Sequence, residues 1–308
     1  MNKQLLLSEF LTTPWALMPE RLQAMSGILT RWSAGEPPSE ETLFQVNTDR
    51  VLRDSRKQMA AASAGSGIAV LPLYGVVTQR GNMVDDISGP GSTSTQQFAA
   101  VLRQMLADDT VGQILIDIDS PGGSVYGVAE LASEIVKARA QKPVIAVANS
   151  LAASAAYWLG CSASEFYVTP GGEVGSIGVW QAHFDYSKAL EEDGVKPTLI
   201  SAGKFKVEGN PYVPLDEQAQ AFMQSRVDDY YNAFVEAVAI GRGVSVNDVR
   251  TGMGEGRVLG ADAALASNMV DGIASFDDVL AKMQANIRST PVRSSSRLKQ
   301  ARDALALM

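Results

Sequence analysis

Three short segments of this 308-residue chain carry groups that could do chemistry, and the first is DSPGGS at residues 119–124. It follows an apolar run that reads as a strand and precedes a helix-like run. In α/β folds, sites collect at the carboxyl ends of strands. Gly122 and Gly123 would let a ligand approach the backbone and would present free N–H groups. The same residues also suit an ordinary turn between a strand and a helix, so this segment decides nothing alone.

The second segment is NSLAASAAYW at residues 149–158, which places Ser154 at the expected start of a helix after an apolar strand. A helix N-terminus favours a developing negative charge nearby. The neighbours Ala153, Ala155 and Ala156 are small enough to leave room for a substrate backbone. A serine at this position also commonly caps a helix, and for a lone serine capping is the commoner role.

The third segment, SAGKFK at residues 201–206, brings Lys204 and Lys206 after a predicted strand and a glycine. A lysine serves as a general base only where its surroundings lower its pKa. A surface loop would have the same sequence. The chain has one histidine, His183, so a serine–histidine mechanism would have to use that residue.

The composition limits the class of protein. The hydrophobic fraction of 46% and charged fraction of 19% predict a folded core, and a net charge of −8 argues against a general nucleic-acid binder. The single cysteine, Cys161, excludes an intrachain disulfide and a zinc site of several thiolates. No run has the length of a membrane span or the pattern of a secretion signal. We therefore expect a cytoplasmic protein with no membrane partner.

The patterning predicts three regions. Residues 1–65 have helical spacing of apolar residues, with a second helix expected over 39–62 and a small-residue linker at 63–67. Residues 66–285 alternate apolar strands with amphipathic helices, which predicts an α/β fold with a mostly parallel sheet and flanking helices. The segment TLIS at 198–201 is one of the expected strands. Residues 286–308 form a basic tail that we expect to be disordered.

The order of the motifs resembles the signal peptide peptidase A family of serine peptidases, which share the crotonase/ClpP-like fold. The motifs are DSPGGS at 119–124, AASAAYW at 152–158, GSIGV at 175–179, GKFK at 203–206 and GRVLGADAA at 256–264. The resemblance implies that Ser154 is the nucleophile and Lys206 the general base. It also implies an oxyanion hole from the backbone N–H groups of Gly123 and Ala155, and an orienting role for Ser176 toward the lysine.

Gly122 and Ser124 are expected to bind substrate beside this site. Glycines usually follow the nucleophile in the family, whereas this chain has Ala155 and Ala156, which should narrow the pocket. The mechanism implied needs no metal or cofactor. His183 stays open as an alternative base, because ClpP-type relatives use a Ser-His-Asp triad, but the intact G-x-x-K motif favours Lys206.

The opening LLSEFLTTPWALMPERL resembles peptidases from the head-assembly clusters of tailed phages and prophages. This implies a capsid-maturation protease that forms a homo-oligomer and cuts scaffold or portal-type proteins. Two alternatives stay open: a cytosolic housekeeping peptidase that degrades released peptides, and a catalytically inactive assembly module.

Overall fold

A computed structural model describes residues 13–19, 26–27, 67–80 and 92–289 of the chain. The predicted helix over 39–62 lies outside the described residues, as do most of the linker at 63–67 and most of the basic tail. The boundary at 65/66 lies outside the described residues and stays a prediction. Helix α11 (Phe276–Ser289) continues through the expected boundary at 285/286, so residues 286–289 belong to this helix rather than to a disordered tail.

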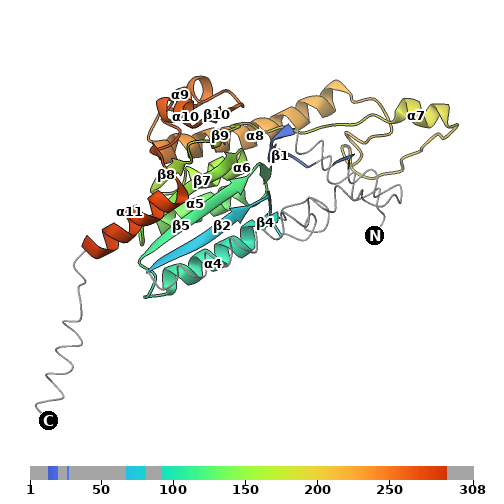
Figure 1. Cartoon of the computed structure of the whole chain (residues 1–308). Helices are drawn as coiled ribbons and strands as arrows, with labels where there is room; N and C mark the ends of the chain where they lie inside the picture. The colour runs from blue at the N-terminus through green and yellow to red at the C-terminus, as the bar shows by residue number, and fades with distance from the viewer. Residues whose placement is uncertain (1–12, 20–25, 28–66, 81–91, 290–308) are drawn as a thin grey trace, which may run out of the picture.

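The core is a largely parallel sheet, as the alternation of strands and helices predicts (Figure 1). Its principal strands are β2 (Ile68–Tyr74), β5 (Gln113–Ser120), β7 (Val144–Ala153), β9 (Glu173–Gly175) and β10 (Val258–Gly260), listed from one edge to the other. Strand β8 (Glu165–Val168) also pairs with β7, and β11 (Gly272–Ile273) pairs with β8. All these pairs are parallel except β9 with β10.

Helices cover both faces of this sheet, and the side-chain alternation of the strands explains the layering. Ile114, Ile116 and Ile118 of β5 are fully buried in the larger apolar cluster, which includes side chains of α4 (Thr95–Ala107) and α5 (Val128–Ala138). Leu115 points to the opposite face, where it joins a second cluster with Val279 and Met283 of α11. The α/β architecture expected from the sequence is therefore confirmed.

A second, smaller sheet lies beside the first and holds the last three residues of the DSPGGS segment. Its order is β1 (Trp15–Leu17), β6 (Gly122–Ser124), β3 (Val76–Thr78) and β4 (Ser92–Ser94). Strand β1 pairs antiparallel with β6, and the other pairs are parallel. Residues 15–17 are thus a strand and not part of a helix, which corrects the helical expectation for these three residues.

The chain beyond strand β9 forms an arm, which we define as residues 182–216. It includes helix α7 (Ser187–Glu192) and projects away from the sheets before the long helix α8 (Glu217–Arg242) returns (Figure 1). The expected strand at 198–201 is wrong, because these residues are exposed and pair with no strand among the described residues. Helices α9 (Val246–Gly252) and α10 (Ala261–Ala266) complete the fold. In the described part of the chain, no helix is long and apolar enough to span a membrane.

Candidate active site

Ser154 lies at the junction between strand β7 and the short buried helix α6 (Ala155–Gly160). Its backbone has φ 56° and ψ −119°, in a left-handed region that a non-glycine residue rarely adopts. The backbone N–H of Ser154 donates to the Gly175 carbonyl at 2.7 Å, which holds this conformation. Strained backbone of this kind clusters at functional sites.

The side chain of Ser154 does not cap the helix that follows it. Helix α6 has no side-chain capping bond from this residue, and Ser154 Oγ instead lies 3.5 Å from the Gly178 carbonyl oxygen. The capping role that the sequence left open is therefore wrong. Ser154 is 1% exposed, so its hydroxyl sits inside the protein next to backbone rather than on the surface.

The SPGG turn lies directly against Ser154. A Cβ placed on Gly122 would be 2.9 Å from Ser154 Cβ and 2.3 Å from the Ala16 carbonyl oxygen, and Gly122 has φ +97°. Only glycine fits such a position. The buried hydroxyl of Ser120 fixes the turn, because it donates to the Gly75 carbonyl at 2.6 Å and accepts from the Gly122 N–H at 3.2 Å.

The two backbone groups expected to form an oxyanion hole flank this contact. Ala155 is the first residue of α6, so its N–H has no acceptor within the helix. Gly123 lies in β6, between β1 on one side and Val77 of β3 on the other. A Cβ on Gly123 would be 1.9 Å from the Val77 carbonyl oxygen, so this strand tolerates no side chain there.

Ser176 lies next to the same junction. It follows Gly175, the residue whose carbonyl accepts from Ser154, and it is 9% exposed. Its own N–H donates to the Arg257 carbonyl at 2.8 Å, and its φ is +53°. The structure therefore brings Ser154, the SPGG turn and Ser176 together, as the family resemblance implies.

Within one chain, the candidate bases Lys206, Lys204 and His183 are not part of the cluster around Ser154. Lys206 is on the exposed arm, where its N–H donates to the Gly203 carbonyl at 3.2 Å, and its side chain makes no hydrogen bond or ion pair with any described residue. Lys204 lies 4.6 Å above the Phe205 ring. His183 also belongs to the arm, and its Nε2 lies 3.3 Å from the Asn210 carbonyl oxygen of the same arm.

Strand β1 is a feature of the site that the sequence did not predict. Trp15 exchanges two backbone hydrogen bonds with Trp180, at 2.9 and 3.0 Å, while the other edge of β1 pairs with β6. A signal was present, because Pro14 and Pro19 bracket this segment. Proline disfavours a helix through the residues before it and favours extended backbone there.

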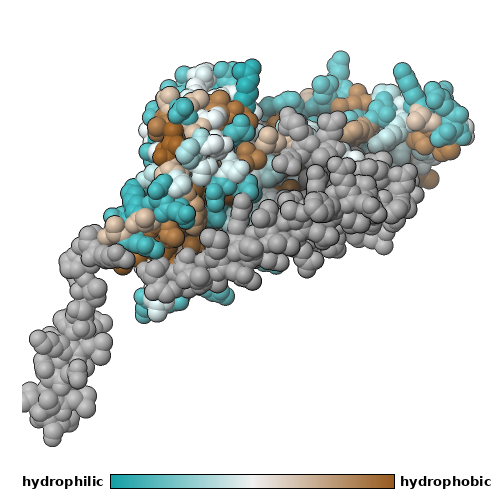
Figure 2. Space-filling view, in the orientation of Figure 1, coloured by the Kyte–Doolittle hydropathy of each residue, from teal (hydrophilic) through white to brown (hydrophobic). Residues whose placement is uncertain are grey.

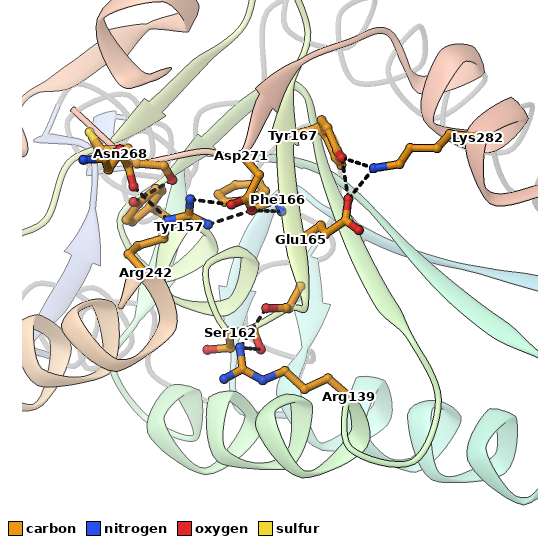
Figure 3. Close-up of polar contacts among 12 residues, drawn as sticks. Arg139, Tyr157, Ser162, Glu165, Phe166, Tyr167, Arg242, Asn268, Asp271 and Lys282 are labelled. Atoms are coloured by element: carbon orange, nitrogen blue, oxygen red, sulfur yellow. Dashed lines mark hydrogen bonds and ion pairs between the residues drawn. The ribbon is translucent and has the colours of Figure 1, made fainter. Parts of the chain in front are cut away.

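Polar contacts behind α6 fix the sheet edge that supports the site (Figure 3). The Arg242 guanidinium donates to both Asp271 carboxylate oxygens at 2.8 Å and to the Asn268 carbonyl at 2.9 Å. Burial alone would raise the pKa of Asp271, but Arg242 and the Phe166 N–H outweigh it and hold that pKa below its usual range. Tyr157 of α6 donates to the Met269 carbonyl at 3.0 Å in the same region.

Figure 3 also shows polar contacts made by helix α11 and by the end of helix α5. Lys282 of α11 donates to the Glu165 carboxylate at 2.6 Å, and Tyr167 also bonds to that carboxylate. Arg139, at the end of α5, donates to the Ala163 carbonyl at 2.8 Å.

Among the described residues, no group of three or more His, Cys, Asp or Glu side chains is placed to hold a metal ion.

Comparison with known proteins points in the same direction as this geometry. A model of the family described as peptidase family S49 matches residues 136–289. The capsid assembly protease C of Escherichia phage lambda is 36% identical over 231 residues, which are 75% of this chain and 52% of that protein. The head-tail preconnector protein GP5 of Enterobacteria phage P21 is 34% identical over 82% of this chain and 50% of that protein.

A relative from outside phages matches the same region. The putative signal peptide peptidase SppA of Enterococcus faecium is 26% identical over 77% of this chain and 68% of that protein. The chain spans about half the length of the two phage relatives.

Proposed function

The chain belongs to peptidase family S49, and on that premise we propose that it is a serine endopeptidase of capsid maturation with Ser154 as nucleophile and Lys206 as general base. The resemblance to the signal peptide peptidase A family is confirmed. The observation that carries the proposal is the junction at Ser154. Its backbone is strained, its hydroxyl does not cap helix α6, and the residue lies against the SPGG turn.

The proposed reaction uses groups of this site in two stages. Neutral Lys206 accepts the proton of the Ser154 hydroxyl while Oγ bonds to the peptide carbonyl carbon, and the carbonyl electron pair moves to oxygen. The N–H groups of Gly123 and Ala155 stabilise that oxyanion. The C–N bond then breaks, the amine leaves with the proton from Lys206, and water hydrolyses the acyl ester on Ser154.

Lys206 lies outside the Ser154 cluster within one chain, so its proposed role as the base needs a contact between two copies. The arm that carries it exposes large apolar side chains, among them Ile200 at 95% and Phe205 at 49%, and brown side chains gather at the α7 end of the molecule in Figure 2. Exposed apolar surface of this kind marks a protein–protein contact. We propose that the arm lies against the Ser154 site of a second copy, which would bring Lys206 to that serine.

The proposed substrates are capsid scaffold or portal-type proteins. The support is that the phage lambda relative is named a capsid assembly protease and the phage P21 relative a head-tail preconnector protein. Coexpression with the products of neighbouring genes, followed by mass spectrometry of new termini, tests this assignment. New termini in a head protein support it, whereas cleavage of short peptides alone favours the housekeeping alternative.

A fluorophosphonate probe tests the catalytic assignment directly. We expect labelling of the wild-type chain at Ser154, no labelling of Ser154→Ala, and loss of peptidase activity in Ser154→Ala and Lys206→Ala. Lys204→Ala and His183→Ala are the matched controls and should retain most activity. An inactive His183→Ala variant beside an active Lys206→Ala variant would overturn the choice of base, and a wild-type chain that never reacts would favour the inactive assembly module.

A further inference from the structure

Strand β1 is the edge strand of the smaller sheet, and an isolated bridge to Trp180 covers its outer side. On one side it pairs antiparallel with β6, in the register Trp15 with Ser124, Ala16 with Gly123 and Leu17 with Gly122. On the other side Trp15 exchanges both backbone hydrogen bonds with Trp180. All three residues of β1 are at most 3% exposed. An added strand held in this way is a common mode of peptide recognition.

In this register the Ala16 carbonyl of β1 lies opposite Gly123, whose N–H is expected to form part of the oxyanion hole. The Met18 N–H donates to Pro121 and the Val125 N–H donates to Pro14, at 3.2 and 3.4 Å, on either side of the Ala16–Gly123 pair. Hydrogen-bonded pairs recur at every second residue of an antiparallel ladder, so Ala16 and Gly123 are the hydrogen-bonded pair between them. The Ala16 carbonyl therefore accepts from the Gly123 N–H.

The same carbonyl lies beside the nucleophile. The position of a Cβ on Gly122 is 2.3 Å from the Ala16 carbonyl oxygen and 2.9 Å from Ser154 Cβ, so both groups lie against Gly122. The next residue of β1 is held as well, because the Trp180 indole N–H donates to the Leu17 carbonyl at 3.0 Å. The bond between Ala16 and Leu17 thus lies where a bond to be cut would lie.

We infer that β1 is a tethered occupant of the peptide-binding groove, which binds as a substrate strand would and keeps substrates out while it is in place. The inference rests on the proposed function and deepens it, because it assigns the groove between β6 and Trp180 to an extended substrate. A backbone N–H is a single donor, so Gly123 cannot hold a substrate carbonyl while Ala16 occupies it. Substrate binding therefore requires β1 to leave.

A reversible lock on β1 tests this inference in the full chain. Trp15 and Ser124 form a pair without backbone hydrogen bonds, with Cα atoms about 4.5 Å apart in such ladders, which is within the range that a disulfide spans. We expect the oxidised W15C/S124C chain to react with a fluorophosphonate probe at Ser154 at least ~10-fold more slowly than the same chain after reduction. Hydrolysis of a peptide with the sequence of residues 12–20 should fall in parallel.

The single variants W15C and S124C, treated with the same oxidant, are the matched controls and should not change on reduction. The native thiol of Cys161 is buried and should stay out of the exchange. A disulfide verified by mass, with equal labelling and hydrolysis before and after reduction, would overturn the inference and leave the peptidase standing. A chain in which Ser154 reacts in no state removes the proposed function and the inference together.

A second variant covers the case in which the double cysteine chain does not fold. Trp15→Ser in the full chain removes a buried side chain that anchors β1, so β1 should leave the groove more often. We expect Ser154 of this variant to label several-fold faster than that of the wild type. A labelling rate equal to the wild-type rate would overturn the inference.

Discussion

Replacing Arg242 with alanine should destabilise the fold far more than removing a surface arginine. Arg242 is near the end of α8, and its side chain is 8% exposed where it donates to Asp271. The substitution leaves the Asp271 carboxylate without its counter-ion and the Asn268 carbonyl without a donor. The substitution therefore removes three hydrogen bonds between α8 and the β8–β11 edge of the sheet.

The size of the effect follows from the exposure of the partner. Breaking a fully buried ion pair costs about 3–5 kcal/mol, because one charge stays buried and unpaired. Asp271 has 37% of its side chain exposed, so water takes over part of its solvation and reduces that penalty. We expect Arg242→Ala to lower the free energy of unfolding by about 2–3 kcal/mol.

Urea-induced unfolding followed by tryptophan fluorescence measures this difference, and Arg103→Ala is the matched control. Arg103 also bonds a carboxylate, that of Glu134, but its side chain is 63% exposed. The control should lose less than about 1 kcal/mol. Equal losses in the two variants would refute the view that burial decides the value of these pairs.

Three further outcomes are expected. The stabilising contribution of Asp271 should be fully present above the unfolded-state pKa near ~3.9 and be lost as pH falls through its lower folded-state pKa, so the stability gap between wild type and Asp271→Asn should close in acid urea titrations. Burial raises the pKa of the Cys161 thiol to about 12, so a thiol reagent at neutral pH should modify it only after denaturation. Mixing Ser154→Ala with Lys206→Ala should restore part of the peptidase activity if the arm of one copy serves the serine of another, whereas a mixture that stays inactive contradicts that placement.

Much of the core could be predicted because its signals are local. The apolar run before DSPGGS is strand β5 and the helix-like run after it is α5, since hydrophobic periodicity is set by residues that are close in sequence. The grouping of Ser154 with the SPGG turn was expected from the order of the motifs and the family that they resemble.

The expectations that proved wrong concern residues whose conformation depends on partners far away in the sequence. Trp15, Ala16 and Leu17 form a strand only because β6 and Trp180 offer backbone groups to them, and helical spacing of apolar residues nearby concealed this. Ile200 belongs to a run with strand composition, yet within the described residues no strand edge lies beside it. Propensity is overridden by such context in both directions.

The unusual backbone of Ser154 has a consequence for any attempt to improve this protein by selection. A left-handed, non-glycine residue costs about 1–3 kcal/mol of stability, which the surrounding hydrogen bonds must offset. Ser154→Gly would relieve that cost while removing the hydroxyl. A screen for thermal stability alone should therefore enrich changes at this position and select stable variants that lack the proposed nucleophile, so stability and peptidase activity must be selected together.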